Sequence, residues 1–381
     1  MTEWLLLAAA AIALLYQSTA LAASMGFFLR RRLAPARPPA VLPPVSILKP
    51  VYGLDPQLEE AVASHLRLDY PEYELLIGFQ RADDPAIPVL RRLLESHPEA
   101  AARIEIIDTR ALNAKTGVID GLARKARHGV LVINDADITV PPDYLRRLVA
   151  SLHEPGVGVV TCLFRARASS VAGCMEALGI ATDYMPSALV APLTGVREFG
   201  FGSTLCFRRE DLEAIGGFAA FGDYIADDYQ LASRIVGLGK RAVFADFPVL
   251  TYLADPGWRA VWRHQLRWAR TIRFSRPGAY AGMPVTHAGL WALANLAAGN
   301  AGAAAALWLA RSVMGAFAGF AVLGHWPALL AAPLIPLWDL FAFAIWVAAW
   351  CGRTAHWRGR LIRLGAKGKI LENHAAAEKK A

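Results

Sequence analysis

The longest uncharged segment of the chain lies at its N-terminal end, and it constrains the fold more than any other feature. Trp4 to Leu29 is a run of 26 residues without a charge, which is long enough to cross a bilayer as a helix. A cleavable signal peptide carries its positive charge in front of the apolar run. Here the residue in front is Glu3, and the positive charge follows as Arg30, Arg31, Arg32 and Arg37. The sequence therefore predicts an uncleaved signal anchor over residues 1–32 with its N-terminus outside, rather than a removed signal peptide, and a cytosolic segment after it.

A second apolar region predicts membrane helices over residues 286–352. Within it, residues 288–310 and 328–350 are each long enough to cross a bilayer, and 312–326 is a shorter candidate between them. Asp339 is expected to face the interior of the helix bundle, because a charge in lipid is costly. The basic segment 353–381 is expected in the cytosol. A cytosolic start and a cytosolic end require an even number of crossings, so two full crossings with an interfacial or re-entrant middle piece satisfy the pattern, and the number stays open.

The apolar segments explain an unusual composition. The chain has 381 residues, of which 55% are hydrophobic and 19% charged, and its formal net charge is +8. The positive charge lies mainly beside the apolar segments, which indicates a lipid bilayer as a partner and argues against nucleic acid. The four cysteines are scattered without a C-x-x-C pair, which argues against a zinc site and a disulfide framework.

The region between the membrane segments, residues 33–257, alternates between strand-like and helix-like patterns. Apolar runs at 45–53, 73–80, 103–109, 129–137 and 157–164 alternate with amphipathic helical patterns. This alternation predicts an α/β domain with a mostly parallel sheet and helices on both faces. Ligands of such sheets bind at the carboxyl ends of the strands. Neither G-x-G-x-x-G nor a P-loop follows the first strand, so a dinucleotide oxidoreductase and a P-loop ATPase are not favoured.

Two carboxylates end the fourth predicted strand. In "LVINDADITV" (131–140), Asp135 and Asp137 follow an apolar run with one residue between them. Residues i and i+2 of an extended chain point the same way, so both side chains can face one cation. Hard oxygen ligands of this kind suit Mg²⁺ or Mn²⁺ together with substrate phosphates. The sequence therefore predicts a Mg²⁺ or Mn²⁺ site on this pair, with a solvated turn as the alternative.

Three further groups of polar residues accompany this pair. They are the acidic pair 83–84 in "RADDPAIPV", the acidic pair 227–228 in "YIADDYQLA", and His264, Arg267 and Trp268 in "WRHQLRWART". Each has a simpler explanation: a helix N-cap for the first pair, the helix dipole for the second, and interfacial anchoring by a basic amphipathic helix over residues 258–285 for the third. These explanations do not account for the joint occurrence of the three groups in this order.

Together these segments resemble the lipid glycosyltransferases of the ceramide glucosyltransferase family, including its bacterial members and the related hopanoid-pathway glycosyltransferases. The resemblance covers nearly the whole chain and rests on the anchor, the C-terminal membrane helices, and the segments "VSILKPVYG", "DDPAI", "NAK", "NDADI", "FGFGSTLCFRREDLEAIGGF", "YIADDYQLA" and "HQLRW". Two features depart from the family pattern. His264 stands where Gln or Arg is usual, with Gln265 adjacent, and residues 185–187 read Met-Pro-Ser where the eukaryotic branch has His-Pro-Arg. Both departures concern the acceptor more than the donor.

The resemblance implies a cytosolic GT-A domain, the Rossmann-like α/β fold of nucleotide-diphospho-sugar transferases, in the inner membrane of a bacterium. It also implies an inverting hexosyltransferase that moves a sugar, in the first instance glucose, from a UDP-sugar to a hydroxyl of ceramide or a ceramide-like membrane lipid. The roles that it implies are uridine contact for Asp84, nucleotide contact for Asn113 and Lys115, metal binding on the diphosphate for Asp135 and Asp137, general base for Asp228, closure over the diphosphate for His264, Arg267 and Trp268, and substrate contact for Gly202 and Gln265.

Other functions remain open at this point. A hopanoid or other lipid glycosyltransferase, for example one that moves N-acetylglucosamine, fits the same motifs. A processive polysaccharide synthase would need more membrane helices, and a polyprenyl-phosphate sugar transferase is less expected to carry the "RW" helix. Three separate pairs of carboxylates on the soluble region count against a non-catalytic scaffold or transporter. The apolar stretch 175–193 either lines the entry of the acceptor or is a plain core helix.

Overall fold

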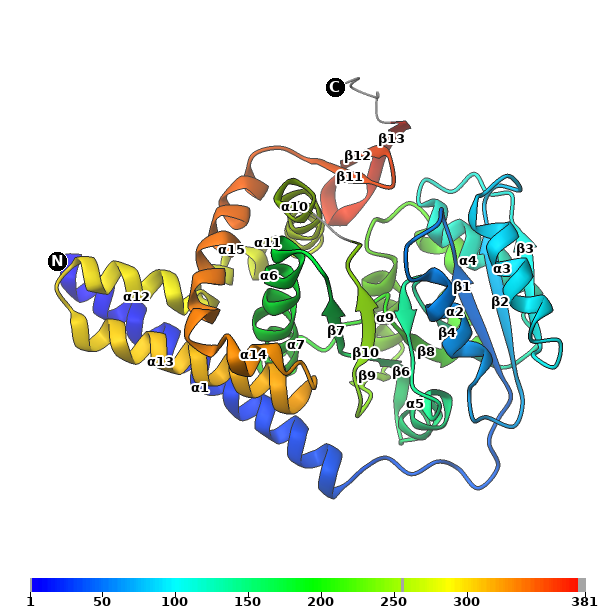
Figure 1. Cartoon of the computed structure of the whole chain (residues 1–381), viewed down its shortest axis with the longest axis horizontal. Helices are drawn as coiled ribbons and strands as arrows, with labels where there is room; N and C mark the ends of the chain where they lie inside the picture. The colour runs from blue at the N-terminus through cyan, green and yellow to red at the C-terminus, as the bar shows by residue number, and fades with distance from the viewer. Residues whose placement is uncertain (1, 255–256, 376–381) are drawn as a thin grey trace. The chain divides into compact units, whose positions relative to one another are not determined.

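The computed structural model describes residues 2–254 and 257–375, and its elements can be followed in Figure 1. The chain forms two compact units. Unit 1 consists of Met1–Leu33, Arg165–Gly195 and Asp255–Ala381, and unit 2 of Ala34–Phe164 and Val196–Ala254. Because these units are defined by packing rather than by function, the boundaries expected at residues 33, 258, 286 and 353 stay predictions.

Unit 2 contains the predicted alternation of strands and helices. Its elements are β1 (Val45–Pro50), α2 (Leu58–Leu66), β2 (Tyr73–Phe79), α3 (Ala86–Glu95), β3 (Ala102–Ile106), α4 (Ala114–Lys125), β4 (Val130–Ile133), β5 (Ile138–Thr139), α5 (Tyr144–Leu152), β6 (Val157–Thr161), β8 (Leu205–Arg208), α8 (Arg209–Ala214), η3 (Phe218–Phe221), α9 (Asp227–Gly237), β9 (Arg241–Phe244) and β10 (Val249–Tyr252). Strand β7 (Phe164–Arg167) leads out of this unit.

The main sheet of unit 2 has seven strands in the order β3-β2-β1-β4-β8-β6-β9. The pairs β1–β2, β1–β4, β2–β3 and β6–β9 are parallel, which confirms the mostly parallel sheet. Strand β8 runs antiparallel to both of its neighbours, and the sequence did not predict this insertion. All residues of β1 and β4 are buried, because helices cover both faces of the sheet.

Helix α4 lies close against the sheet at Gly78 of β2. A β-carbon at this position would lie 2.7 Å from Cγ1 of Val118 and 2.8 Å from Cδ1 of Leu122, so a larger residue would push the helix away. Leu122 and Leu131 belong to one buried apolar cluster that also contains Phe207. This packing fixes the start of α4 at the carboxyl edge of the sheet.

Unit 1 is mainly helical. Its elements are α1 (Thr2–Leu33), α6 (Val171–Gly179), η1 (Ile180–Tyr184), α7 (Met185–Val190), η2 (Ala191–Thr194), α10 (Trp258–Ser275), α11 (Pro277–Ala281), η4 (Met283–Thr286), α12 (Ala288–Ala297), α13 (Ala301–Phe317), η5 (Ala318–Val322), α14 (Pro327–Leu330), η6 (Ala332–Leu334), α15 (Ile335–Trp350), β11 (Thr354–Trp357), β12 (Arg360–Leu364), η7 (Ala366–Gly368) and β13 (Ile370–Ala375).

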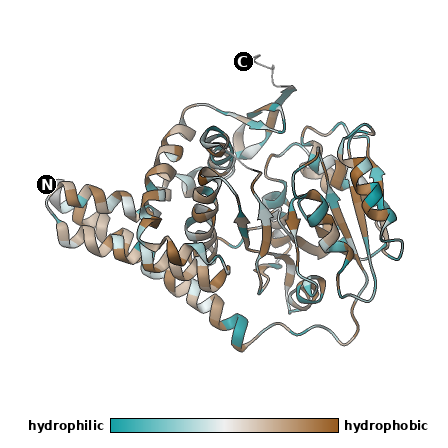
Figure 2. Ribbon diagram, in the orientation of Figure 1, coloured by the Kyte–Doolittle hydropathy of each residue, from teal (hydrophilic) through white to brown (hydrophobic). Residues whose placement is uncertain are grey.

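Three helical segments among the described residues are long and apolar enough to cross a membrane: Trp4–Leu33, Ala301–Val322 and Ala332–Trp350. In Figure 2, α12 and α13 are mostly hydrophobic and the arginine-rich end of α1 is hydrophilic. The expected crossing at 288–310 is wrong in its bounds, because α12 ends at Ala297 and Gly299 has a φ of 83° that breaks the helix. The expected short segment 312–326 instead belongs mostly to the span that begins at Ala301.

A buried ion pair joins the helices of unit 1. Nη2 of Arg311 on α13 lies 2.9 Å from Oδ1 of Asp339 on α15, and both side chains are fully buried. Asp339 also accepts a hydrogen bond from the backbone N–H of Gly289 at 2.8 Å, and Arg311 donates to the carbonyl oxygen of Thr182 at 2.7 Å. The prediction that Asp339 faces the interior of the bundle is therefore confirmed.

The amphipathic helix predicted near residue 258 is α10, and its apolar face packs on α15. Ala269 belongs to an apolar cluster with Ile345 and Ala349. Arg270 and Arg273 donate hydrogen bonds to four backbone carbonyls of residues 350–354, and thus satisfy the C-terminal end of α15.

Part of the basic segment that was predicted as a tail is folded. Strands β11, β12 and β13 form an antiparallel sheet, which the sequence did not predict. Residues 376–381 of this segment lie outside the described residues.

Candidate functional site

The candidate site in unit 2 is a cluster of three carboxylates around one ammonium group. Nζ of Lys115, in the first turn of α4, lies 2.8 Å from Oδ1 of Asp135 and 3.3 Å from Oδ2 of Asp227. Burial lowers the pKa of Lys115, but the charges of Asp135, Asp227 and Asp228 outweigh that effect and hold the pKa above its ordinary value. Lys115 is therefore a permanent cation at the carboxyl edge of the sheet.

Asp227 and Asp228 begin α9. Oδ2 of Asp228 accepts a hydrogen bond from the backbone N–H of Gly202 at 3.0 Å, and Oδ1 accepts one from that of Tyr229 at 2.7 Å. Burial, together with the neighbouring charge of Asp227, raises the pKa of Asp228 to about 6. Burial also raises the pKa of Asp227, although Lys115 opposes the shift. A carboxylate that titrates near neutral pH suits the role of a general base.

Gly202 leaves the space beside Asp135 open. A β-carbon at position 202 would lie 2.8 Å from Oδ2 of Asp135 and 2.9 Å from Nζ of Lys115. Any other residue at position 202 would therefore crowd the side chains of Asp135 and Lys115. The carbonyl oxygen of Gly202 also accepts a hydrogen bond from the backbone N–H of Asp135 at 3.1 Å. This bond holds the segment around Gly202 against the segment that follows β4.

Asp137 is oriented by the short pair of strands beside it. Strands β5 and β10 pair antiparallel with Thr251 opposite Ile138, and Oγ1 of Thr251 donates a hydrogen bond to Oδ2 of Asp137 at 2.5 Å. Asp135 and Asp137 are hard oxygen donors at a sheet edge. Among the residues that the structure describes, no group of three or more His, Cys, Asp or Glu could hold a metal ion. Two protein carboxylates completed by phosphate and water oxygens are a usual Mg²⁺ environment, so the donor set fits the predicted ion.

Lys49 is a site residue that the sequence reasoning missed. It is fully buried at the end of β1, and its Nζ donates to Oδ1 of Asn134 at 2.6 Å and to the carbonyl oxygen of Asp135 at 2.7 Å. Burial lowers the pKa of Lys49 to about 7, although Asp137 and Asp135 raise it. The available signal was a lysine at the end of the apolar run "VSILK", where a buried strand rarely places one.

Two predicted contacts to the nucleotide have structural roles of their own. Oδ1 of Asn113 caps α4 by accepting from the N–H of Thr116 at 3.3 Å, and its Nδ2 donates to the carbonyl oxygen of Tyr224 at 2.8 Å. Asp84 accepts from the N–H of Gly53 at 2.8 Å and from that of Ala86 at 3.0 Å. The bond from Ala86 supports the helix-start explanation for Asp84, whereas the capping role of Asn113 was not predicted. The contacts of both residues to a nucleotide stay predictions.

The "HQLRW" residues lie on α10 in unit 1. Nδ1 of His264 lies 2.6 Å from Oε1 of Glu176, and Nε2 of Gln265 donates to the same oxygen at 2.7 Å. The ring of Trp268 lies 4.6 Å from that of His264 and 5.1 Å from that of Tyr184, between ring centroids. The guanidinium of Arg267 lies 6.0 Å from the ring centroid of Trp357 on β11.

Glu176 was not predicted as a site residue. Glu176 is 1% exposed. A buried carboxylate needs hydrogen-bond partners, and here His264 and Gln265 supply them. The signal for it was an acid inside the apolar stretch 175–193, which holds only two acids, Glu176 and Asp183. The structure thus brings Lys115, Asp135, Asp227, Asp228 and Gly202 together in unit 2. It brings His264, Gln265 and Trp268 together in unit 1.

The chain is similar to proteins of known class. A family model described as glycosyl transferase family 21 matches residues 5–370. The chain is 28% identical over 216 residues to ceramide glucosyltransferase 1 of Caenorhabditis elegans, which covers 56% of this chain and 46% of that protein. It is 32% identical over 127 residues to a ceramide glucosyltransferase of Gibberella zeae, which covers 30% of this chain and 24% of that protein. The chain therefore matches less than half the length of these relatives.

One solved structure shows the same fold. It is the mannosyltransferase PcManGT from Pyrobaculum calidifontis in complex with GDP-Man and Mn²⁺, which aligns with a TM-score of 0.52 and 22% identity over 90% of this chain and 98% of that chain. This likeness confirms the α/β fold of the GT-A type.

Proposed function

Because the chain belongs to glycosyl transferase family 21, we propose that it is an inverting glycosyltransferase that moves a hexose from a UDP-sugar to a hydroxyl group of a membrane lipid. The observation that carries this proposal is the cluster of Lys115 with Asp135, Asp227 and Asp228 at the carboxyl edge of the sheet. Glucose is the proposed sugar and ceramide or a ceramide-like lipid the proposed acceptor, because the similar curated proteins are named ceramide glucosyltransferases.

The cluster supplies the two groups that such a transfer needs. A Mg²⁺ or Mn²⁺ ion on Asp135 and Asp137 would neutralise the leaving diphosphate. Lys115 adds a fixed positive charge beside the same carboxylate, where it lowers the cost of bringing a diphosphate to an acidic site. Asp228 accepts the proton of the acceptor hydroxyl through a carboxylate oxygen, which suits its raised pKa.

The step is a single displacement at the anomeric carbon. The bond from that carbon to the diphosphate oxygen breaks, the bond to the acceptor oxygen forms, and UDP leaves with the electron pair. The acceptor proton passes to Asp228. One displacement inverts the anomeric carbon, so an α-linked donor gives a β-glycoside. Asp84 and Asn113 are proposed to contact the nucleotide, and His264, Arg267 and Trp268 to close over the diphosphate, with Gly202 and Gln265 against the substrate.

We further propose that the chain spans the inner membrane of a bacterium with unit 2 in the cytosol. The N-terminal span is followed by arginines, and two long apolar helices precede the basic segment 353–381. Two crossings return that segment to the cytosolic side, as its charge requires. Single cysteines placed near Arg37 and near Lys369 should resist an impermeant thiol reagent in intact cells and react after lysis. Labelling in intact cells at either position would overturn the orientation.

The reaction is tested with a matrix of donors and acceptors. The full chain in proteoliposomes is given each of several UDP-sugars with ceramide, diacylglycerol or a hopanoid, and the lipid products are identified by mass spectrometry. A β-hexosyl ceramide from UDP-glucose supports the proposal in full. Transfer of N-acetylglucosamine or transfer to the hopanoid would replace the sugar or the lipid but keep the reaction class. UDP release without any lipid product, or an elongating polysaccharide, would overturn it.

A further inference from the structure

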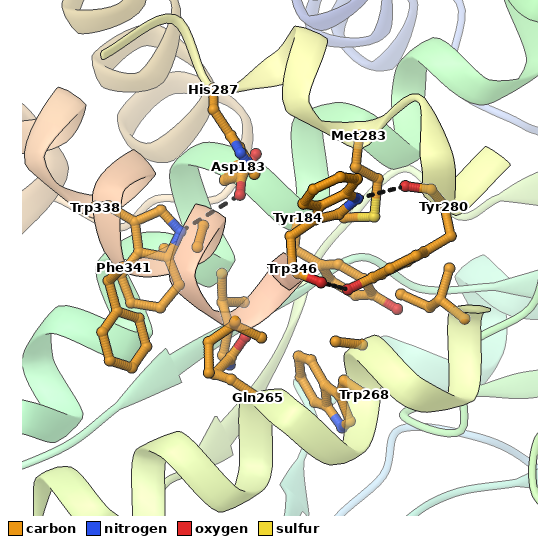
Figure 3. A pocket seen from close by; sticks show the side chains of 16 residues that line it. Asp183, Tyr184, Gln265, Trp268, Tyr280, Met283, His287, Trp338, Phe341 and Trp346 are labelled. Carbon is orange, nitrogen blue, oxygen red and sulfur yellow. Dashed lines mark hydrogen bonds between the residues drawn. The ribbon is translucent and has the colours of Figure 1, made fainter. Parts of the chain in front are cut away.

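Unit 1 contains a cavity lined by aromatic and aliphatic side chains with a few polar ones (Figure 3). The empty space between the lining side chains is about 560 Å³, which includes space open to solvent. One face of α15 lines it at helical spacing, through Trp338, Phe341, Ala342, Ile345 and Trp346. Because α15 forms most of the apolar span Ala332–Trp350, the cavity lies along a helix that can cross a membrane, where lipid is the abundant ligand.

The other walls connect this cavity to the "HQLRW" helix. Gln265, Trp268, Ala269 and Ile272 of α10 line it at the same helical spacing. Gly179, Ile180, Asp183 and Tyr184 line it from α6 and η1, so one end of the stretch 175–193 forms a cavity wall. The helix that carries Trp268 and Gln265 is thus shared between the predicted substrate contacts and the apolar cavity.

The cavity has a polar end with unused hydrogen-bonding capacity. His287 lines it and is 1% exposed, and neither of its ring nitrogens has a hydrogen-bond partner in the part of the chain that the structure describes. Burial lowers the pKa of His287, so the neutral ring offers one donor and one acceptor. Oδ2 of Asp183 accepts from Nε1 of Trp338 at 3.3 Å, which leaves Oδ1 outside that bond. In Figure 3 the His287 ring and the Asp183 carboxylate lie at the same end of the cavity.

A buried polar side chain without a partner costs free energy, and a ligand that pairs with it recovers that cost. We infer that the cavity binds the lipid acceptor, with its hydrocarbon chain along the aromatic walls and a hydrogen-bonding group on His287 and Asp183. This inference rests on the proposed function and deepens it, because it restricts the class of acceptor.

The polar end selects lipids by their donors. The carboxylate of Asp183 only accepts hydrogen bonds, so its partner has to be a hydroxyl or an amide N–H. The hydroxyl that receives the sugar is the reacting group and is not available for this contact. The acceptor therefore carries at least one further donor. Ceramide has an amide N–H and a second hydroxyl, whereas diacylglycerol has esters and a single hydroxyl, so diacylglycerol is excluded as a good acceptor.

The test compares His287→Phe with the wild type, because phenylalanine keeps the ring and removes both nitrogens. The full chain in proteoliposomes is assayed with ceramide and with ceramide methylated on the amide nitrogen or on the second hydroxyl. The variant should raise KM for ceramide about five- to tenfold, the cost of one lost hydrogen bond, and leave KM for the UDP-sugar unchanged. At least one methylated ceramide should show a raised KM with the wild type and no further rise with the variant, since the two changes remove the same contact.

His153→Phe is the matched control, because His153 is an exposed residue at the end of α5 in unit 2. The KM of this variant for ceramide should stay at the wild-type value.

A second measurement needs no turnover and no variant. A ceramide with a diazirine in its acyl chain is photolysed with the wild-type protein, and the labelled peptides are mapped. Labels should fall on residues 179–184, 265–272 or 338–346. If His287→Phe does not fold, this map decides alone.

The outcomes separate the two ideas. A wild type that glycosylates no lipid contradicts the proposed function. If the wild type glycosylates ceramide and His287→Phe has the same KM for ceramide, the inference is contradicted and the proposed function stands. The same holds if the wild type glycosylates ceramide but its diazirine labels fall outside the cavity. Transfer to diacylglycerol as efficient as to ceramide would also overturn the inference.

Discussion

Lys115 and Asp135 form an ion pair in which Nζ lies 2.8 Å from Oδ1. Lys115 lies in the first turn of α4, whereas Asp135 follows the end of β4. The same ammonium lies 3.3 Å from Asp227 and lowers the pKa of both acids at the start of α9. The charge of Lys115 therefore opposes the rise in pKa that burial and mutual repulsion cause at Asp227 and Asp228.

Replacing Lys115 by methionine should make the enzyme more sensitive to acid. Without the ammonium, the pKa of Asp228 rises further, so the rate should fall more at pH 6 than at pH 8 relative to the wild type. The measurement is the pH profile of kcat/KM. Lys125→Met on the same helix, where the side chain is half-exposed and pairs with Glu105, is the control and should keep the wild-type profile. A uniform loss of rate at all pH values would show that Lys115 does not act through the carboxylates.

The wild-type rate itself should depend on the protonation of Asp228. A base has to be unprotonated, and the pKa of this carboxyl is raised to about 6. Activity is therefore present above that pH and is lost as the pH falls through about 6, well above the pH at which an ordinary aspartate titrates. The acid limb of kcat/KM reports this pKa in the free enzyme. An acid limb at the ordinary aspartate pKa would contradict the assignment.

Asp228→Asn and Asp227→Asn should distinguish the roles of the two acids at the start of α9. Loss of a general base typically costs a factor of about 10²–10⁴ in rate, so Asp228→Asn should bind UDP and transfer almost nothing. It loses one backbone hydrogen bond, because an amide NH₂ cannot accept from Gly202 or Tyr229, and its melting temperature should be followed. Asp227→Asn loses the ion pair with Lys115, because its amide oxygen is neutral, but should keep more activity. If Asp228→Asn retained most of the transfer rate, the base would have to be another carboxylate.

Removal of divalent metal with EDTA should abolish transfer. A weaker form of the same effect is expected for Thr251→Val, which should bind the metal less tightly. The valine cannot donate to Oδ2 of Asp137, and loss of such a supporting bond typically costs about 10- to 100-fold in metal affinity or activity. The measurement is the Mn²⁺ concentration that gives half-maximal rate. Thr139→Val on the neighbouring strand is the control, because Oγ1 of Thr139 has no hydrogen-bond partner among the described residues. Full turnover by metal-free protein would remove the metal from the mechanism.

The ion pair of Arg311 and Asp339 should matter for stability rather than for chemistry. Arg311→Met leaves a buried charge on Asp339 without its partner, which typically costs about 3–5 kcal/mol. The double variant Arg311→Met with Asp339→Leu replaces both charges and should recover much of that loss, since a buried pair often contributes little over apolar residues. Thermal unfolding in detergent measures both. A double variant less stable than the single one would show that the pair contributes beyond its mutual neutralisation.

The sequence predicted the fold because its signals are local. Apolar runs such as "VSILK" and "GVLVI" have the length and composition of buried strands, and the helical patterns between them force parallel neighbours. The same local reading placed Asp135 and Asp137 at the carboxyl edge, because they directly follow β4. Membership of the family and the apolar span near the N-terminus were also correctly predicted from the sequence.

The tertiary structure decided what depends on contacts between distant segments. Lys115 meets Asp227 across more than a hundred residues of chain, and Glu176 meets His264 across 88. No periodicity records such pairs, since each side chain alone fits a helix surface. The antiparallel strand β8, the broken helix at Gly299 and the folded segment 354–375 were missed because they depend on pairing partners and on one backbone angle. Burial of Lys49 and His287 became visible only once the chain had closed around them, because burial is a property of packing and not of the local sequence.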